Sequence, residues 1–462
     1  MSKKILLLNP PGDKIYFRDY YRSKVSKSRY YYHPVDLLYL SGRFKSGDFE
    51  VSLIDAIADG LSAEDTLSAI KAGSPDIILA LIASPSYNQD IAFLKSVKNL
   101  LPSCQLIITG DVCRDLGDKI MASDAFIDAI LLDFSTNDIV DYLAGEPAGA
   151  IPNLIYRRGA EIISGGEVHS QGVFDVPLPR WDLFHLEKYS FPFSKKKRMA
   201  SLLTDFGCPY NCSFCSINTL GFKLRPVSSI IEEIKLLKSY DIDELFIRDQ
   251  SFGADRDRTI ELCQAIIKEN LRISWTCFCR VDIIEEELIK IMKAAGLHTI
   301  MFGIESTNED VLKDYNKNTS VEQMRKAISL CQQNGVRAAG TFIIGLPGES
   351  KESIIKTIKM AKELKLDYAS FNVAAPTFGS KFRTDAIANG WIDENNIEMD
   401  TAKGTPIWKK HDLANEEISK LHRYAIITFY LDPRYLVRRL LALRSWDEVS
   451  QAIREAKSLI FG

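Results

Sequence analysis

The sequence predicts an α/β protein with two successive sheet regions and a helical C-terminal region. Three observations predict this fold class. Residues 1–145 contain short, continuously apolar segments separated by helical patterns, strand and helix patterns alternate regularly from Ala200 onward, and no strand pattern follows Pro376. Apolar strands that alternate with helices are typical of parallel sheets covered on both faces.

The chain of 462 residues is too long for one ordinary domain, and its patterns divide it into four parts. We predict a doubly wound, Rossmann-like domain over residues 1–145 and a linker with a small hairpin over residues 146–198. Six strand–helix units predict a partial (β/α)6 barrel over residues 199–380, and residues 381–462 are predicted to be a helical C-terminal region.

The composition excludes some classes of protein. Hydrophobic residues make up 46% of the chain and the formal net charge is −3, which argues against a nucleic-acid partner. The apolar run near the N-terminus is too short for a signal peptide, and no apolar stretch is long enough to span a membrane. Nine cysteines in a chain without an export signal fit a reducing compartment, so we expect a cytoplasmic location.

The strands of the first region are apolar along their whole length, which predicts a parallel sheet. They are Lys4–Asn9, Glu50–Asp55, Asp76–Ile82, Gln105–Thr109 and Ala129–Leu132.

Ligands of doubly wound sheets bind at the carboxyl ends of the strands. We therefore expect a ligand at the loops formed by residues 9–12, 84–87 and 110–113. In the second of these loops, Ser84, Ser86 and Tyr87 are equally compatible with a strand-end turn and a helix cap.

The predicted linker contains several prolines and a hairpin formed by residues 154–156 and 161–163. Its end carries the basic run Lys195–Arg198. Such a run is typical of solvated surface, with an anionic substrate or a lipid head group as the alternative partner.

The second region carries six predicted strands, each followed by a helix or turn. They are Ala200–Asp205, Glu244–Arg248, Ile273–Arg280, Thr299–Glu305, Ala338–Gly345 and Tyr368–Val373. Barrels of this kind place their chemistry at the carboxyl ends of the strands.

Three cysteines follow the first of these strands. Cys208, Cys212 and Cys215 have the spacing C-x3-C-x2-C, which cysteines that merely pack in a core seldom adopt by chance. Zinc sites and cubane iron–sulfur clusters normally take four protein ligands. No fourth Cys or His follows nearby, so the pattern predicts a metal centre with one open coordination position.

This motif resembles the signature of the radical S-adenosylmethionine (SAM) superfamily. The resemblance implies a [4Fe-4S] cluster held by Cys208, Cys212 and Cys215, with SAM on the fourth iron. It also implies that SAM is cleaved reductively to methionine and a 5′-deoxyadenosyl radical. The second region would then be a radical SAM barrel.

Further residues at strand ends match SAM-binding positions of that superfamily. The resemblance implies that Phe214 flanks the adenine, Arg280 holds the SAM carboxylate and Glu305 faces the SAM amine or ribose. Ile343 and Gly345 would lie beside the adenine at the fifth strand. Core packing for Phe214, an ion pair for Glu305 and an ordinary turn for Gly345 are the alternatives.

The first region, together with the cysteines, resembles the cobalamin-binding radical SAM class, which begins with a similar strand and Asn-Pro-Pro. The implied cobalamin-binding residues are Asn9, Pro10, Ser84, Ser86, Tyr87, Gly110 and Asp111. The histidine motifs of cobalamin proteins are missing, since Gly110 is followed by Asp111, Val112 and Cys113. Either cobalamin binds without a protein imidazole, or the domain keeps the fold without the cofactor.

Near the C-terminus, apolar and basic residues alternate at helical spacing over residues 429–441. This pattern predicts a helix packed on the barrel. The alternative is an interfacial helix that contacts a membrane peripherally or an apolar substrate.

With cobalamin, the resemblance implies C-methylation of an unactivated carbon in a small-molecule substrate. Without methyl transfer, the radical would rearrange, cyclise or couple its substrate. Both reactions need an external electron donor such as flavodoxin or ferredoxin. A protein of another class, which binds a metal cluster without turnover, is the remaining alternative.

Overall fold

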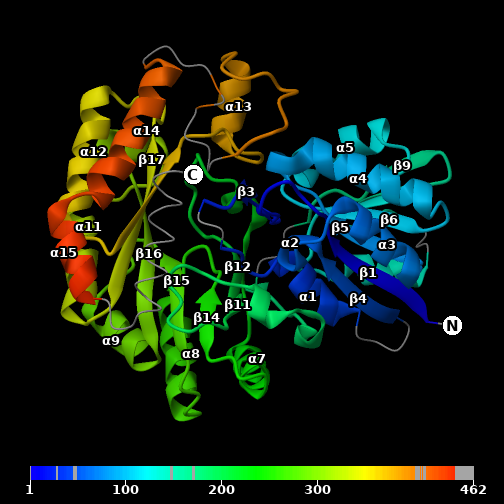
Figure 1. Ribbon diagram of the computed structural model, residues 1–462, viewed down its shortest axis with the longest axis horizontal. Coiled ribbons are helices and arrows are strands. Elements are labelled where there is room, and N and C mark those ends of the chain that lie inside the picture. Colours follow the sequence, from blue (N-terminus) through cyan, green and yellow to red (C-terminus); the bar gives the residue numbers. More distant parts are fainter. Residues whose placement is uncertain are drawn as a thin grey trace.

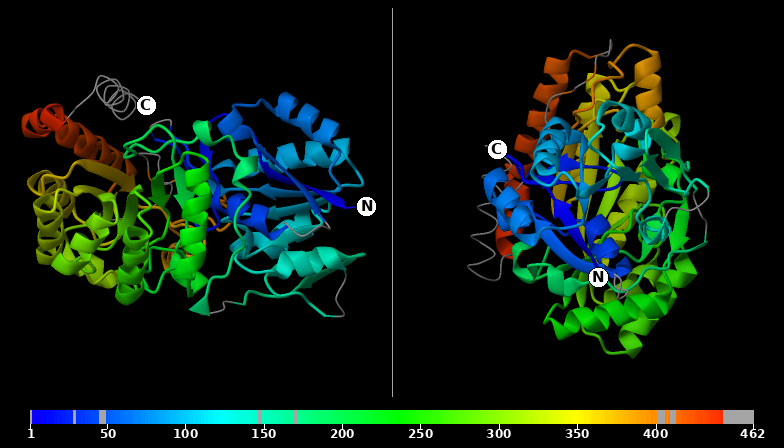
Figure 2. Two further views of the ribbon diagram at one scale, coloured as in Figure 1. Left: turned by 90° about the horizontal axis from the view of Figure 1, so that it is seen from below. Right: turned by 90° about the vertical axis from the view of Figure 1, so that its right-hand side faces the viewer.

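The computed structural model describes residues 2–442 except 28–29, 45–48, 146–148, 169–171, 401–405, 407 and 409–412. The chain forms a mixed α/β fold with two large sheets and many helices (Figure 1). The N-terminal sheet and the C-terminal helices lie towards opposite ends of the long axis (Figure 2).

The first sheet has seven strands in the order β4-β1-β5-β6-β7-β8-β9. Its first five strands are parallel: β4 (Phe49–Asp55), β1 (Lys3–Asn9), β5 (Ile77–Leu81), β6 (Gln105–Thr109) and β7 (Ala129–Leu131). All side chains of β5 and β7 are buried, which is why these strands are continuously apolar.

The predicted hairpin of the linker belongs to this sheet. Strands β8 (Leu154–Arg158) and β9 (Glu161–Ser164) pair antiparallel with β7 and with each other. The segment predicted as a linker therefore extends the first sheet by two strands.

Helices connect the strands of the first sheet. They are α1 (Val35–Arg43), α2 (Ala56–Asp59), α3 (Ala63–Gly73), α4 (Tyr87–Leu100), α5 (Cys113–Ser123) and α6 (Asp138–Ala144). The side chain of Ser62 accepts a hydrogen bond from the backbone N–H of Asp65 and thereby caps the start of α3.

The second sheet has six strands in sequence order, all parallel. They are β11 (Ala200–Leu202), β14 (Glu244–Ile247), β15 (Ser274–Cys279), β16 (Leu297–Glu305), β17 (Arg337–Ile344) and β18 (Tyr368–Val373). Each lies within or close to its predicted range.

Helices cover the outer side of the second sheet (Figure 1). They are α7 (Val227–Ser239), α8 (Arg256–Lys268), α9 (Glu286–Ala294), α11 (Val321–Gln333) and α12 (Lys351–Glu363), with the short α10 (Glu309–Asp314) after β16. Ser320 and Ser350 form capping boxes that fix the starts of α11 and α12.

Several short elements were not predicted. Strands β12 (Asp205–Gly207) and β13 (Phe222–Leu224) flank the cysteine motif and form a small sheet with β10 (Gly172–Val173). Near the N-terminus, β2 (Tyr16–Phe17) pairs antiparallel with β3 (Lys24–Val25). We call residues 16–27 the N-terminal hairpin.

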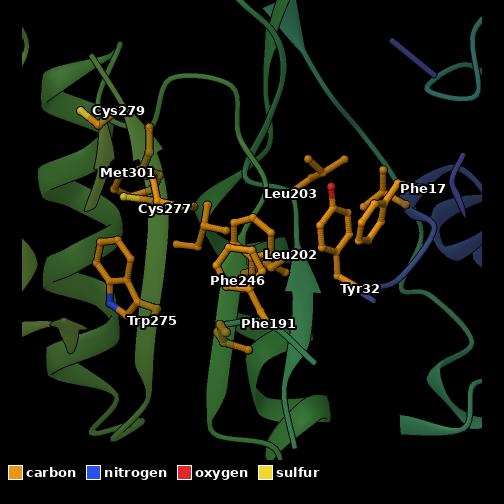
Figure 3. Packing of buried hydrophobic residues seen from close by; sticks show 14 of the residues in the cluster. Phe17, Tyr32, Phe191, Leu202, Leu203, Phe246, Trp275, Cys277, Cys279 and Met301 are labelled. Atoms are coloured by element: carbon orange, nitrogen blue, oxygen red, sulfur yellow. The ribbon is translucent and has the colours of Figure 1, made fainter. Parts of the chain in front are cut away.

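The N-terminal hairpin packs against the second sheet. The ring centroids of Phe17 and Tyr32 are 4.1 Å apart, and those of Tyr32 and Phe246 are 5.5 Å apart. Figure 3 shows these rings beside Leu202 and Leu203. One continuous core cluster therefore contains residues of both sheets.

The C-terminal region contains α13 (Lys381–Ala388), α14 (Asn415–Tyr430) and α15 (Pro433–Ala442). The hydroxyl of Tyr430 on α14 donates to the carbonyl of Ala369 in β18 at 2.8 Å, so α14 packs on the second sheet. On α15, Leu440 and Leu441 are 67% and 82% exposed. No helix among the described residues has the length and apolarity needed to cross a membrane.

Candidate active site

The cysteine loop begins directly after β12 and is held by backbone contacts. Gly207 has φ +84°, and a Cβ at this position would lie 1.9 Å from the carbonyl oxygen of Gly221. Only glycine fits here. The N–H of Cys208 donates to that carbonyl at 3.1 Å, and the N–H of Cys215 donates to the carbonyl of Cys212 at 3.0 Å.

The three cysteines line a cavity of ≈ 230 Å³ at the carboxyl ends of the second sheet. Phe214, Arg280, Glu305 and Ile343 line the same cavity. These residues come from the cysteine loop and from the ends of β15, β16 and β17, so strands far apart in the sequence converge on one site.

Burial disfavours the charged thiolate form of Cys208 and Cys215. It raises the pKa of the Cys208 thiol to about 12, to which Cys215, Asp205 and Cys212 contribute by charge repulsion. Burial also raises the pKa of Cys215. Thiolates bind iron, so loading of a cluster would release these protons.

The donor set fits a cubane cluster held by three thiolates, because each thiolate of a cubane binds a different iron. Within the described parts of the chain, no three His, Cys, Asp or Glu side chains group around a point suited to one metal ion. A cubane does not require such a point, since its irons occupy separate corners. The three thiols share one cavity wall instead.

Arg280 is fixed by contacts on several sides. Its guanidinium donates to both carboxylate oxygens of Asp282, at 2.9 and 2.8 Å, and to the carbonyl of Lys317 at 2.8 Å. A further N–H points at the sulfur of Cys212 at 3.6 Å. The guanidinium also lies 4.0 Å from the ring centroid of Tyr210. This arrangement holds a positive charge beside the cluster position without occupying every donor.

Glu305 ends β16 in an unusual backbone conformation. Its φ is +65°, which is uncommon for a residue with a side chain, and the pairing with β17 is irregular between Gly303 and Glu305. The Glu305 carboxylate lies 3.6 Å from the Lys317 ammonium. The predicted ion pair is therefore present, and the carboxylate still faces the cavity. Strained backbone of this kind clusters at functional sites.

Gly345 is the one predicted SAM-site residue outside the described cavity lining. It forms the turn after β17 with φ +82°. One oxygen of the Glu349 carboxylate accepts from the N–H groups of Gly345 and Leu346, and the other accepts from the Ser306 hydroxyl at 2.8 Å. The local geometry of Gly345 is that of an ordinary turn, which was the alternative to contact with SAM.

The predicted cobalamin-binding residues lie at the carboxyl edge of the first sheet, but several of their polar side chains are hydrogen-bonded to other residues of the protein. The amide of Asn9 donates to Asp55 at 2.8 Å, and the hydroxyl of Ser84 donates to Asp111 at 2.8 Å. The hydroxyl of Ser86 donates to Asp90 at 2.7 Å, and Ser86 makes no side-chain cap hydrogen bond to α4.

None of these seven predicted residues is among the described residues that line the cysteine cavity. Besides those already named, they are Pro10, Tyr87 and Gly110. The carbonyl of Pro10 accepts from Arg18 at 2.8 Å. A Cβ on Gly110 would lie 1.9 Å from the carbonyl oxygen of Ile82, so tight backbone packing explains this glycine.

The sequence patterns missed one wall of the cavity. Tyr21, Arg22, Lys24 and Tyr32 reach it from the N-terminal hairpin and the segment that follows. Lys317, after α10, was also missed. The available signal was the mixture of aromatic and basic residues from Tyr16 to Lys24, directly after the Asn-Pro-Pro-Gly turn.

Comparisons with known proteins agree with this geometry. The family model of the radical SAM superfamily matches residues 204–361, which include the cysteine loop and end within α12. The chain is 32% identical over 421 residues to an uncharacterized methyltransferase of Pyrococcus horikoshii, covering 88% of this chain and 89% of that protein.

A second relative is named as a cyclase and not as a methyltransferase. The anaerobic magnesium-protoporphyrin IX monomethyl ester cyclase of Rubrivivax gelatinosus is 26% identical over 359 residues, which cover 74% of this chain and 64% of the cyclase. Among solved structures, the radical SAM methyltransferase TsrM of Kitasatospora setae, with cobalamin and a [4Fe-4S] cluster bound, superposes with a TM-score of 0.67. The identity is 17%, over 84% of this chain and 78% of TsrM.

The match to the methyltransferase of Pyrococcus horikoshii extends over almost the whole chain, and the family model covers the segment that carries the three cysteines. The chain therefore belongs to the radical SAM superfamily.

Proposed function

We propose that this protein is a radical SAM methyltransferase that binds a [4Fe-4S] cluster, SAM and cobalamin and methylates an unactivated carbon of a small molecule. One observation carries the radical part of the proposal. The thiols of Cys208, Cys212 and Cys215 line one cavity together with four of the five predicted SAM-binding residues.

In this proposal, Cys208, Cys212 and Cys215 hold the cluster, and Arg280 binds the SAM carboxylate through the Nη1 group, which Asp282 and Lys317 do not use. Glu305 accepts a hydrogen bond from the SAM amine or ribose, because an ionised carboxylate is an acceptor only. When bound, the cluster supplies the electron that cleaves SAM. Phe214 packs on the adenine, and the cavity walls keep water from the radical.

Cobalamin enters the proposal through the relatives. TsrM contains it, and the likeness to TsrM shows the fold. Four of the predicted side chains are already hydrogen-bonded within the protein. They are Asn9, Ser84, Ser86 and Asp111. They do not fit as side-chain ligands of cobalamin, so contacts from these loops would come from the backbone.

The proposal also retains the finer sequence-based predictions. They are the division at residues 145, 198 and 380, with the second region as a partial barrel, a flavodoxin or ferredoxin as electron donor, and a cytoplasmic location. Peripheral membrane contact stays a prediction, supported by the exposed apolar side chains of α15.

The decisive experiment is anaerobic reconstitution with iron and sulfide, followed by reduction in the presence of SAM. We expect 5′-deoxyadenosine as a product, measured by chromatography. Protein purified from cells supplied with cobalamin should show the cobalamin absorbance. If iron-loaded protein releases no 5′-deoxyadenosine, the radical function is wrong, and if the protein contains no cobalamin, the methyltransferase proposal is wrong.

A second candidate function is radical rearrangement, cyclisation or coupling without methyl transfer. The similarity to the cyclase of Rubrivivax gelatinosus favours this alternative. The two candidates differ in the fate of the SAM methyl group. Transfer of isotope label from methyl-labelled SAM to a product would support methylation.

A further inference from the structure

We propose that Arg22 and Lys24 bind a doubly charged oxyanion of the substrate, a phosphate or phosphonate group, in the cysteine cavity. This inference names the substrate class of the proposed enzyme and so rests on the proposed function. It assigns substrate recognition to the N-terminal hairpin, which lies outside the segment matched by the family model.

The cations that line the cavity fall into two groups. Arg280 and Lys317 each have a carboxylate partner, Asp282 at 2.8 Å and Glu305 at 3.6 Å. Arg22 and Lys24 are half-buried, line the same cavity and make no ion pair within the described residues.

Several interior cations elsewhere in the protein have a carboxylate partner, while the buried Arg43 and Arg383 donate to backbone carbonyls instead. Arg18 binds Asp90, Arg225 binds Glu233 and Arg248 binds Asp19. Partly buried charges normally acquire a partner because desolvation without one is costly. The two cations of the hairpin therefore indicate a partner that is not part of the chain.

The hairpin backbone is held in place before any ligand binds. The N–H of Ser23, between the two cations, donates to Asp111 at 3.0 Å. The carbonyl of Tyr21 accepts from the Ser216 hydroxyl at 3.0 Å, and the N–H of Val25 donates to Asp400 at 3.2 Å. Fixing the backbone in advance lowers the entropy cost of binding.

A third cation shows that the region is strongly positive. The ammonium of Lys27 donates to the carbonyl of Phe371 at 2.7 Å and to the side chain of Asn372 at 2.9 Å. Burial, followed by the positive charges of Lys24 and Arg22, lowers the pKa of Lys27 to about 7, and Asp400 acts in the opposite direction. An anion bound beside these charges would offset their mutual repulsion.

The residue types fit a phosphate or phosphonate group. A guanidinium pairs with two oxygens of such a group, while an ammonium acts as a point charge beside it. Two unpaired positive charges match two negative charges. The SAM carboxylate carries one negative charge, and the proposed function assigns it to Arg280, which lies at the end of β15.

Inorganic phosphate is the probe for this site. The reduced cluster is paramagnetic, so phosphate bound in the cavity should relax faster in phosphorus NMR. The cluster-loaded, reduced wild-type protein should show a saturable relaxation enhancement. The double variant Arg22→Gln/Lys24→Gln should bind phosphate at least about tenfold more weakly, since two charge-assisted contacts are lost.

Two further variants serve as controls. Lys71→Gln/Lys95→Gln removes two exposed positive charges that do not line the cavity and should behave like wild type. Lys24→Arg keeps the charge and should retain binding. The iron content and cluster absorbance of each variant report whether it has folded.

Three outcomes would overturn the inference. The first is that the wild type shows no relaxation enhancement, and the second is that the double variant shows an equal enhancement. The third is that the double variant has a shifted reduction potential of the cluster but unchanged phosphate binding. The last outcome would assign both cations to the cluster. The phosphate experiment does not require SAM cleavage, so failure of the proposed radical function is detected separately by the absence of 5′-deoxyadenosine.

Discussion

At the scale of single residues, the cysteine thiols decide whether the site can act at all. Cys212→Ser should abolish cluster binding and reduce 5′-deoxyadenosine formation to the level of iron-free protein, because a cubane with two thiolates is not held. Iron content and SAM cleavage measure this. Cys263→Ser is the matched control, since Cys263 is buried on α8 and does not line the cavity. Equal SAM cleavage in Cys212→Ser would contradict the assignment.

A substitution of Arg280 tests the proposed contact with the SAM carboxylate. Lys cannot reproduce the several hydrogen bonds that the guanidinium makes to Asp282 and Lys317. Arg280→Lys should weaken SAM binding by about 1.5–3 kcal/mol, the range for a hydrogen bond to a charged group. Titration of SAM into cluster-loaded protein measures the change. The exposed Arg272→Lys should bind SAM like wild type, and wild-type affinity in Arg280→Lys would remove Arg280 from the site.

Ionisation of Asp111 should make the free energy of unfolding depend on pH. Burial raises its pKa from 3.8 to about 6. The folded state therefore holds the proton more tightly than the unfolded state, and this stabilisation is complete below about pH 4 and lost as the pH rises through about 6. The loss amounts to about 3 kcal/mol.

Asp111→Asn should flatten the fall in unfolding free energy between about pH 4 and pH 6, because the amide does not titrate. Chemical denaturation of both proteins across this range measures the slope. Asp118→Asn, which changes an exposed carboxyl on α5, the helix that follows Asp111, should leave the slope unchanged. An unchanged slope in Asp111→Asn would show that other groups dominate.

The fixed spacing predicted the cysteines, and the resemblance to the radical SAM superfamily implied four of the residues that share their cavity, because both depend on local sequence motifs. It did not predict Arg22 and Lys24, whose position depends on tertiary contacts to Asp111, Ser216 and Asp400. Nor did it predict that Ser84 and Asp111 would bind each other, since polar residues at a strand end suit a ligand or a neighbour equally well.

At the scale of elements, the turn between β17 and α12 depends on one carboxylate. Glu349 is 3% exposed and accepts from two backbone N–H groups and the Ser306 hydroxyl. Glu349→Ala should lower the free energy of unfolding by about 3 kcal/mol, because buried donors lose their acceptor. Denaturant titration measures this. Glu352→Ala, which changes an exposed carboxyl in the first turn of α12, should change stability little. Equal losses in both variants would contradict the role of Glu349 in the turn.

The long strands were predicted because a fully buried parallel strand needs a continuous apolar run. The strands β2, β3, β10, β12 and β13 are two or three residues long and were missed. Such short strands form where other parts of the chain hold them and carry no periodic pattern of their own. Their absence from the prediction also hid the N-terminal wall of the cavity.

At the scale of the whole molecule, one core cluster joins the two sheets. A fragment of residues 199–462 should therefore expose the apolar surface of β11 and β14 that Tyr32 and neighbouring residues cover. We expect this fragment to aggregate or to bind a hydrophobic dye, as measured by light scattering and fluorescence. A monomeric fragment with cooperative unfolding, comparable to that of the full-length control, would show that the second region folds independently.

The N-terminal hairpin also sets an order of events during biosynthesis. Its Val25 is bonded to Asp400, which lies 375 positions later in the chain. The three cysteines leave the ribosome well before Asp400, so a cluster inserted into the nascent chain would face solvent and oxygen without its completed wall. We therefore expect the iron–sulfur centre to mature after synthesis of the chain through Asp400.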